Sequence, residues 1–266
     1  MKESHFYFDS SGSKLYGCIY SPSRKNLKKE EVRKGYIIIH PFAEEKKCSH
    51  KILVELARKL YYVFLFDLYG CGDSEGDFSK GNITRWLTDL DSAQTFFCKE
   101  YKIISTGFIG LRLGGFISLI FGSQMNSVDQ LVLLEPILSP QRFFRQLLRK
   151  KMIKEFKTFG IIRTDGKNIS ENIKEDNIVD FDGYAIGSKF FKDIAKYNID
   201  KLNFTKSISI LGLSKTNSGY GKKYVNSLQN DLNIQYKQLD FEPFWDKIEI
   251  QNYNRLIEVI SRECII

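Results

Sequence analysis

The stretch that decides the fold is Ile103-Ile-Ser-Thr-Gly-Phe-Ile-Gly-Leu-Arg-Leu-Gly-Gly115, followed by an apolar run to Met125. Residues 103–109 predict a strand that is buried on both faces, as in a parallel sheet. The turn Gly110-Leu-Arg-Leu-Gly114 then leads into a helix predicted over 116–125. A buried strand that passes through a tight glycine-rich turn into a helix is typical of α/β folds.

Strands and helices alternate in the same way on both sides of this stretch. Because a strand–helix–strand connection within one sheet is almost always right-handed, the alternation predicts a mostly parallel sheet covered by helices. Two short runs, 5–8 and 14–20, flank the turn residues 9–12 and predict an N-terminal β-hairpin. The other predicted strands are 35–40, 62–67, 130–136, 207–212 and 234–239, and the other predicted helices are 47–60, 83–101, 220–232 and 253–262.

The alternation is interrupted once, between residues 139 and 206, where the sequence is charged and helical without a clear buried strand. Such an insertion after the fourth buried strand, with the hairpin in front, is typical of an α/β-hydrolase fold with a helical lid. We therefore expect a single domain. Its core consists of residues 1–138 and 207–266, and its lid of residues 139–206.

Composition limits the class of protein. The chain has 266 residues, 42% hydrophobic and 27% charged, which excludes a disordered chain and allows a large core. Its net charge of +8 favours anionic partners but is too small to predict nucleic-acid binding. No long apolar run predicts a membrane span, and the first residues lack an apolar secretory core. The five cysteines have no metal-binding spacing, so we expect a cytoplasmic protein without metal or cofactor.

The turn after the strand at 103–109 holds Arg112 where an α/β hydrolase carries its nucleophilic serine. Arginine stays protonated at physiological pH and cannot attack a carbonyl. The three histidines, His5, His40 and His50, all lie early in the chain, and the segment 239–245 after the last strand contains none. The sequence therefore predicts a protein that is not a Ser-His-Asp hydrolase.

The glycine-rich loop Gly70-Cys-Gly-Asp-Ser-Glu-Gly76 contains two other nucleophile types, Ser74 and Cys71. In this fold the loop passes the chain tightly to the next helix, so we interpret Ser74 as structural. No histidine stands near Cys71 in the sequence, which argues against a thiol nucleophile. The acidic residues of the loop would repel a phosphate, and no Gly-Lys-Ser/Thr follows.

Three loops should converge at the carboxyl ends of the strands, where open parallel sheets bind ligands. They supply our candidate catalytic residues, Arg112, Glu44, Glu45 and Glu242, and we expect a glutamate to contact the arginine. On the same loops we expect ligand contacts from His40, Phe42, Leu111 and Trp245. The alternative is that Arg112 forms a structural ion pair that holds the loops together.

A basic segment, residues 142–157, opens the predicted lid with seven basic residues and one acidic residue. Phe144, Leu147, Leu148 and Ile153 fall roughly on one face, which predicts an amphipathic helix. Three interpretations remain open for its outer face: a solvated surface, capture of an anionic ligand, or weak contact with a membrane surface. Nucleic acid is not expected, because no aromatic stacking pattern accompanies the charge.

A set of motifs runs along nearly the whole chain. They are His40-Pro-Phe-Ala-Glu-Glu45, Phe66 to Phe78, Trp86 with Asp89, Gly110 to Gly114, Pro136 with Arg142 to Arg149, Gly183-Tyr184, and Glu242-Pro-Phe-Trp245 with Glu249-Ile250. In this combination the sequence resembles the α/β-hydrolase-like proteins associated with the exosortase A system, specifically their second class. Family members occur beside polysaccharide-export genes, so the resemblance implies a role in extracellular-polymer or protein-sorting metabolism. The sequence departs from the family at Cys48, His50 and the strongly basic lid.

We therefore expect an α/β-hydrolase-fold protein that acts on, or binds, a small anionic molecule or an acyl or glycosyl derivative. The alternative is a catalytically inactive pseudo-hydrolase that serves as a ligand- or protein-binding module. A reaction does not follow from a fold, so the site has to decide between them.

Overall fold

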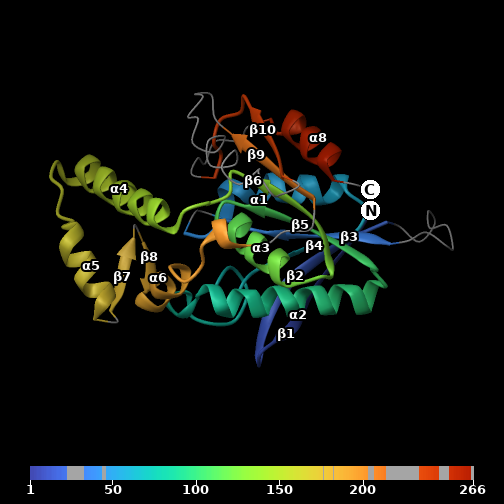
Figure 1. The fold of residues 1–266 in the computed structure, drawn as a ribbon, viewed down its shortest axis with the longest axis horizontal. Coiled ribbons are helices and arrows are strands. Elements are labelled where there is room, and N and C mark those ends of the chain that lie inside the picture. Colours follow the sequence, from blue (N-terminus) through green and yellow to red (C-terminus); the bar gives the residue numbers. More distant parts are fainter. Residues whose placement is uncertain are drawn as a thin grey trace.

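The computed structural model describes residues 1–22, 33–43, 46–175, 177–181, 183–202, 207–213, 234–245 and 252–264. Within these residues, an eight-stranded sheet forms the central layer (Figure 1). Its strands, in chain order, are β1 (Lys2–Ser10), β2 (Ser13–Ser21), β3 (Lys34–Ile39), β4 (Val63–Phe66), β5 (Ser105–Leu111), β6 (Val128–Leu134), β9 (Ser207–Leu213) and β10 (Ile234–Leu239).

The strands follow the order β1-β2-β4-β3-β5-β6-β9-β10 across the sheet. The hairpin strands β1 and β2 are antiparallel, and β2 pairs antiparallel with β4, whereas every pair from β4 to β10 is parallel. The prediction of an α/β-hydrolase fold, with a mostly parallel sheet behind an N-terminal hairpin, is confirmed. The chain leaves β3 towards β4 on one side and returns to β5 on the other, so the direction of winding switches beside β3.

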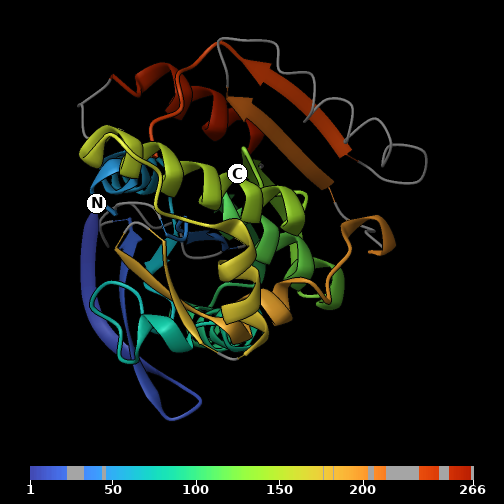
Figure 2. The same ribbon diagram turned by 90° about the vertical axis from the view of Figure 1, so that its left-hand side faces the viewer.

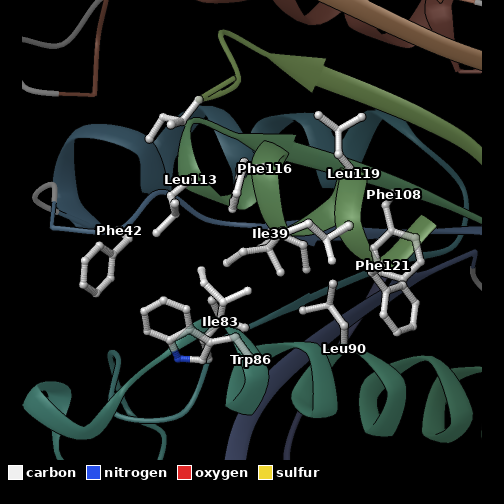
Figure 3. Packing of buried hydrophobic residues seen from close by; sticks show 14 of the residues in the cluster. Ile39, Phe42, Ile83, Trp86, Leu90, Phe108, Leu113, Phe116, Leu119 and Phe121 are labelled. Atoms are coloured by element: carbon white, nitrogen blue, oxygen red, sulfur yellow. The ribbon is translucent and has the colours of Figure 1, made fainter. Parts of the chain in front are cut away.

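Helices cover both faces of the sheet. Trp86 and Leu90 of α2 and Phe116 of α3 join the larger apolar cluster on one face, as Figure 3 shows. On the other face, Leu56 of α1 and Ile260 of α8 join a second cluster. The bounds of these helices are α1 (Lys46–Lys59), α2 (Ile83–Tyr101), α3 (Leu113–Gln124) and α8 (Asn254–Glu263).

The glycine-rich loop after β4 is tied to the hairpin through Ser74. Its hydroxyl donates to the carbonyl of Asp67 (2.5 Å) and accepts from the N–H of Tyr16 on β2 (2.9 Å). The Asp67 carboxylate in turn accepts from the N–H of Asp73 (3.0 Å). The Ser74 hydroxyl thus donates to one backbone group and accepts from another, which supports its interpretation as a structural residue.

The insertion forms a lobe beside the carboxyl ends of the strands, seen at the left of Figure 1 and towards the viewer in Figure 2. Its long helix α4 crosses in front of the core in Figure 2. The elements of the lobe are α4 (Pro140–Phe159), α5 (Gly166–Lys174), β7 (Ile178–Phe181), β8 (Tyr184–Gly187) and α6 (Ser188–Ile194), followed by a short 3₁₀ helix at Ile199–Lys201.

Two details of the lobe correct the sequence prediction. The lobe contains an antiparallel hairpin, β7–β8, with Val179, Phe181 and Ile186 buried, although no clear strand was expected there. Its four-residue strands are too short to give a strong alternating pattern. The buried residues of α4 are Phe143 and Leu147, whereas Ile153, predicted on the inner face, is 45% exposed because the second half of α4 extends past the core.

The remaining predicted elements agree with the structure to within a few residues, except that the helix predicted at 220–232 lies outside the described residues. Among the described helices, none combines the length and hydropathy that crossing a bilayer requires.

Candidate functional site

Arg112 lies alone between β5, which ends at Leu111, and α3, which begins at Leu113. Its backbone has φ 57° and ψ −116°, a pair that residues other than glycine rarely adopt. The Arg112 N–H donates to the carbonyl of Leu134 (3.0 Å), and its carbonyl accepts from the N–H of Ile137 (3.1 Å). These bonds fix the elbow against the end of β6, which is how a strained backbone persists.

Two glycines allow the elbow to form. A Cβ at Gly110 would lie 2.5 Å from the Cα of Gly115, and a Cβ at Gly114 would lie 2.4 Å from the carbonyl oxygen of Ile39. Both neighbours are backbone atoms, so a larger residue would have to displace the main chain. The close approach sets the start of α3 against the end of β3. The elbow therefore lies where the sheet changes its direction of winding, the usual ligand position in open parallel sheets.

The Arg112 side chain extends to the lobe and to the loop after β10. Its guanidinium donates to Gln146 Oε1 of α4 (3.3 Å) and, at 3.5 Å, to the carbonyl of Glu135. Its Cζ lies 4.8 Å from the ring centroid of Trp245, a cation–π arrangement. One partly buried cation thus joins the elbow, the lobe and the C-terminal part of the core.

Glu135 brings a carboxylate to the same place. It follows β6 directly, with φ 42°, and its Oε2 accepts from the N–H of Leu213 at 2.6 Å. Burial raises the pKa of Glu135, while the Leu213 N–H and the positive charges of Arg112 and Arg142 act in the opposite direction. The carboxyl group therefore lies next to two cations, with its pKa raised above the usual value.

These side chains line a small cleft of about 60 Å³ between the strand ends and α4. The lobe contributes Arg142, Phe143 and Gln146, and the edge strand β10 contributes Tyr236. Burial, and to a lesser extent the charge of Glu135, raises the pKa of Tyr236, which remains a neutral phenol at physiological pH. The cleft therefore combines two guanidinium groups, one carboxyl group and one phenol with apolar walls, which suits a small polar ligand.

The structure places the predicted site residues in different surroundings. It brings Arg112 and Trp245 together, and it puts Glu242 in a half-buried position in the same loop as Trp245. Glu44 and Glu45, the other predicted carboxylates, lie outside the described residues. Leu111 is fully buried among the residues under α1 and α8.

His40 and Phe42 line a different cavity, of about 150 Å³, which also includes Cys71 and Tyr184. His40 Nδ1 lies 2.7 Å from the carbonyl of Pro41, and its Nε2 accepts from the N–H of Leu68 at 3.3 Å. Both ring nitrogens of His40 therefore contact backbone groups. Phe42 is 3% exposed and stacks on Phe78 at 4.8 Å between centroids.

The site residues predicted from the sequence do not include Glu135, Gln146 or Tyr236. Glu135 lies at the carboxyl end of the strand predicted at 130–136, and a carboxylate in that position is the available signal. Gln146 carried no signal, because its role depends on how α4 lies over the cleft.

Comparisons with known proteins agree with this architecture. A family model described as serine aminopeptidase, S33, matches residues 30–201, a range that includes the elbow and most of the lobe. No curated protein matches the sequence.

Solved structures with this fold cover nearly the whole chain. Est1E from Butyrivibrio proteoclasticus, in its ferulic acid complex, has a TM-score of 0.70 and 17% identity, and the match covers 97% of this chain and 96% of Est1E. A putative hydrolase from Agrobacterium vitis S4 has a TM-score of 0.65 and 15% identity, with 98% of each chain covered. The mouse alpha/beta hydrolase domain-containing protein 10 has a TM-score of 0.63 and 15% identity, with 97% of each chain covered. At these identities the likeness shows the fold.

Proposed function

The chain belongs to the family described as serine aminopeptidase, S33, and from this membership we propose that it retains the ligand cleft of an α/β hydrolase without Ser-His-Asp chemistry. Arg112 occupies the nucleophile position in elbow geometry, and a guanidinium cannot act as a nucleophile there. The chain has no histidine after His50, and none of its three histidines is among the described residues that line the cleft.

The observation that carries the proposal is the position of the Arg112 guanidinium at the cleft. Two of its contacts, to Gln146 Oε1 at 3.3 Å and to the Glu135 carbonyl at 3.5 Å, are long for charge-assisted hydrogen bonds. A carboxylate would form shorter, bidentate bonds with the same donors, and Arg142 adds a second cation on the wall. The ligand is therefore a small molecule that bears a carboxylate or a similar anion, including acyl or glycosyl derivatives.

Glu135 is the group that would handle a proton in this cleft. Its pKa is already raised by burial, and an anion bound to Arg112 would raise it further, because a second negative charge disfavours the ionised carboxylate. Ligand binding would then be coupled to proton uptake by Glu135. A protonated carboxyl group beside a bound acyl or glycosyl group is placed to act as a general acid.

We also propose that the chain is related to the α/β-hydrolase-like proteins associated with the exosortase A system. The arginine elbow and the segment Glu242-Pro-Phe-Trp245 carry much of that resemblance, and they meet in the contact between Arg112 and Trp245. A shared recognition site would explain why these two distant segments occur together. The ligand would then come from the metabolism of an extracellular polymer, and the protein would work in the cytoplasm.

A second candidate function is a pseudo-hydrolase that binds a ligand or a protein without turnover. The observation in its favour is that Arg112 already joins three parts of the fold, through Gln146, the Glu135 carbonyl and Trp245. In that case the guanidinium holds the lobe on the core, and Glu135 has no proton to transfer.

The test combines binding with turnover. Calorimetry with a panel of small carboxylates and sugar acids should show binding that Arg112→Ala weakens strongly, about 10²-fold if a charge-assisted bidentate pair is lost. Arg145→Ala is the matched control, since Arg145 is an exposed arginine of α4 that does not line the cleft. Circular dichroism must show that both variants fold. Equal affinities for Arg112→Ala and the control would exclude the cleft as the anion site.

Turnover separates the two candidate functions. Mass spectrometry of acyl and glycosyl derivatives that carry a carboxylate should show a product that Glu135→Gln abolishes while binding remains. Binding without product for every ligand that binds would favour the pseudo-hydrolase.

A further inference from the structure

The outer tip of the lobe, defined here as residues 153–163, exposes an unusual number of large apolar side chains. Among the described residues, ten large hydrophobic side chains are markedly exposed, and half of them lie in this short segment. Isolated exposed apolar residues are normal, but a contiguous group marks an interaction site. The five are Ile153 (45% exposed), Phe156 (60%), Phe159 (52%), Ile161 (56%) and Ile162 (51%).

The fold holds this tip in a defined shape. Helix α4 ends at Phe159, and Gly160 adopts φ 71°, with its N–H donating to the carbonyl of Phe156 at 2.8 Å. Glu155 then accepts from the N–H groups of Arg163 (2.9 Å) and Thr164 (2.7 Å). The hydrogen bond from the Thr164 hydroxyl, together with these two backbone bonds, lowers the pKa of Glu155 to about 2. The apolar residues are thus presented by a capped helix end.

A trough runs along this surface. It is lined by apolar side chains of α4, including Leu148, Met152 and Phe156, and by Ile162 from the following turn. Arg145, Arg149 and Lys157 form its rim. In Figure 1 the turn between α4 and α5 is the part of the chain farthest to the left, at the outer edge of the lobe.

Almost all of the net charge of the protein lies in this part of the lobe. Residues 140–163 contain eight of the 40 Lys and Arg residues and one of the 32 Asp and Glu residues, so they carry +7 of the net charge of +8. The single acidic residue, Glu155, accepts hydrogen bonds from the turn after α4 and pairs with Lys151, whose Nζ lies 3.5 Å from its Oε1. The partner of this surface must therefore be anionic.

We propose that the outer tip docks on an anionic lipid bilayer. Phe156, Phe159 and Ile162 would enter the interfacial layer, acyl chains would fill the trough, and the rim residues would contact headgroup phosphates. Aromatic and aliphatic residues backed by lysine and arginine are the combination by which peripheral helices bind such membranes. A second copy of the chain fits poorly, because pairing this surface with itself would bring together residues 140–163 of both copies, each with a charge of +7. The inference does not depend on what the cleft binds.

Vesicle sedimentation with the full chain tests this inference. The protein should bind vesicles of phosphatidylcholine mixed with phosphatidylserine, bind pure phosphatidylcholine weakly, and dissociate as the salt concentration rises. The double variant Phe156→Ser with Ile162→Ser leaves the charge unchanged and should lower the partition coefficient roughly tenfold or more, because buried apolar area is lost. The matched control is Tyr61→Ser with Ile104→Ser, which removes two apolar side chains elsewhere that are at least as exposed on average (59% and 70%) and should bind like the wild type.

Other results would overturn the proposal. If neither vesicle type binds, or if the tip variant and the control bind equally well, the tip is not a bilayer contact. Light scattering distinguishes a protein interface: self-association that the tip variant abolishes, without vesicle binding, would assign the surface to a second copy. If the wild type binds an acidic amphipathic peptide, the tip variant does not, and vesicles are not bound, the surface would be assigned to a protein partner.

Discussion

The guanidinium of Arg112 lies over the indole ring of Trp245, with its Cζ 4.8 Å from the ring centroid. In a hydrolase of this fold, the elbow and the loop after the last strand supply the nucleophile and the base, which touch each other. Here the same two places supply a cation and an aromatic ring. The two loops meet as the reacting pair does, with a cation–π contact in its place.

The first prediction is that serine-directed probes do not label the protein. A fluorophosphonate requires a nucleophile activated by a base, and the elbow carries Arg112. The variant Arg112→Ser should also remain unlabelled, because no histidine lies in the segment 240–245 to activate the new hydroxyl. Gel fluorescence with a known serine esterase as the positive control checks both. Labelling of the wild type at Ser74 would show that the glycine-rich loop is catalytic.

A second prediction uses Trp245 as a reporter of the cleft. The chain has two tryptophans, and the other, Trp86, belongs to α2 and is fully buried. A carboxylate that binds Arg112 should alter the environment of the Trp245 ring and shift the tryptophan emission. The shift should disappear in Trp245→Phe, while Trp86 continues to report an intact core. A shift that survives in Trp245→Phe would mean that the anion binds elsewhere.

The third prediction concerns the pH dependence of stability. Burial raises the pKa of Glu135 in the folded state above its usual 4.5, so between these two values the folded state binds more protons than the unfolded state. The free energy of unfolding should then fall as the pH rises from about 4.5 through the folded-state pKa. Glu135→Gln keeps an acceptor for the Leu213 N–H but cannot ionise.

Urea unfolding of both proteins across this pH range gives the test. The difference in unfolding free energy should shift in favour of Glu135→Gln as the pH rises and level off above the folded-state pKa. Asp89, whose pKa burial also raises, is present in both proteins and cancels in the difference. Parallel curves for the two proteins would show that the Glu135 pKa is not raised.

A fourth prediction separates structure from chemistry in the glycine-rich loop. Ser74→Ala removes the bond to the Asp67 carbonyl and leaves the N–H of Tyr16 without its acceptor. The free energy of unfolding should fall by about 1–3 kcal/mol, with unchanged affinity for anions at the cleft. Ser123→Ala is a suitable control, because it removes only a local bond to the Ile120 carbonyl on α3. A loss of ligand affinity at intact stability would contradict the structural role.

The fifth prediction tests the packing of the elbow. Gly114→Ala would place a Cβ 2.4 Å from the Ile39 carbonyl oxygen, and we expect a destabilisation of about 1–3 kcal/mol or more by thermal unfolding. Gly166→Ala is the matched control, since a Cβ there meets nothing within 4 Å. It should be neutral or slightly stabilising because alanine favours helices. Equal melting temperatures for the two variants would indicate a looser elbow.

Most of the architecture was predictable because it depends on local pattern. Continuous apolar runs locate the parallel strands, and the spacing of Gly110 and Gly114 locates the elbow. The hairpin β7–β8 was missed because strands of four residues give too little pattern to separate them from a loop. The outer half of α4 was misjudged because exposure there depends on how far the core extends beneath the helix, which a helical period does not encode.

The site was predicted only in outline. The sequence identified Arg112 and Trp245 separately, but their contact arises from two loops that are 133 positions apart in the chain and was not predicted as a pair. Glu135 was not predicted as a site residue, because its position depends on burial and on the strand pairing of β5 with β6. Both properties are tertiary, so they leave no local signal beyond a carboxylate at a strand end.

The bond between Gln146 and Arg112 has a consequence for regulation of the cleft. Under the proposed function, an amide oxygen of the lobe occupies a donor that an anionic ligand would use, so the protein carries an intramolecular competitor for that ligand. An anion would have to displace the Gln146 amide from this donor, and a carboxylate that satisfies both guanidinium edges would gain enough to do so. The apparent affinity would then be the intrinsic affinity reduced by the fraction of molecules in which Gln146 is released. Occupancy of the cleft and release of Gln146 would be one equilibrium, with selectivity set by the strength of the displaced bond.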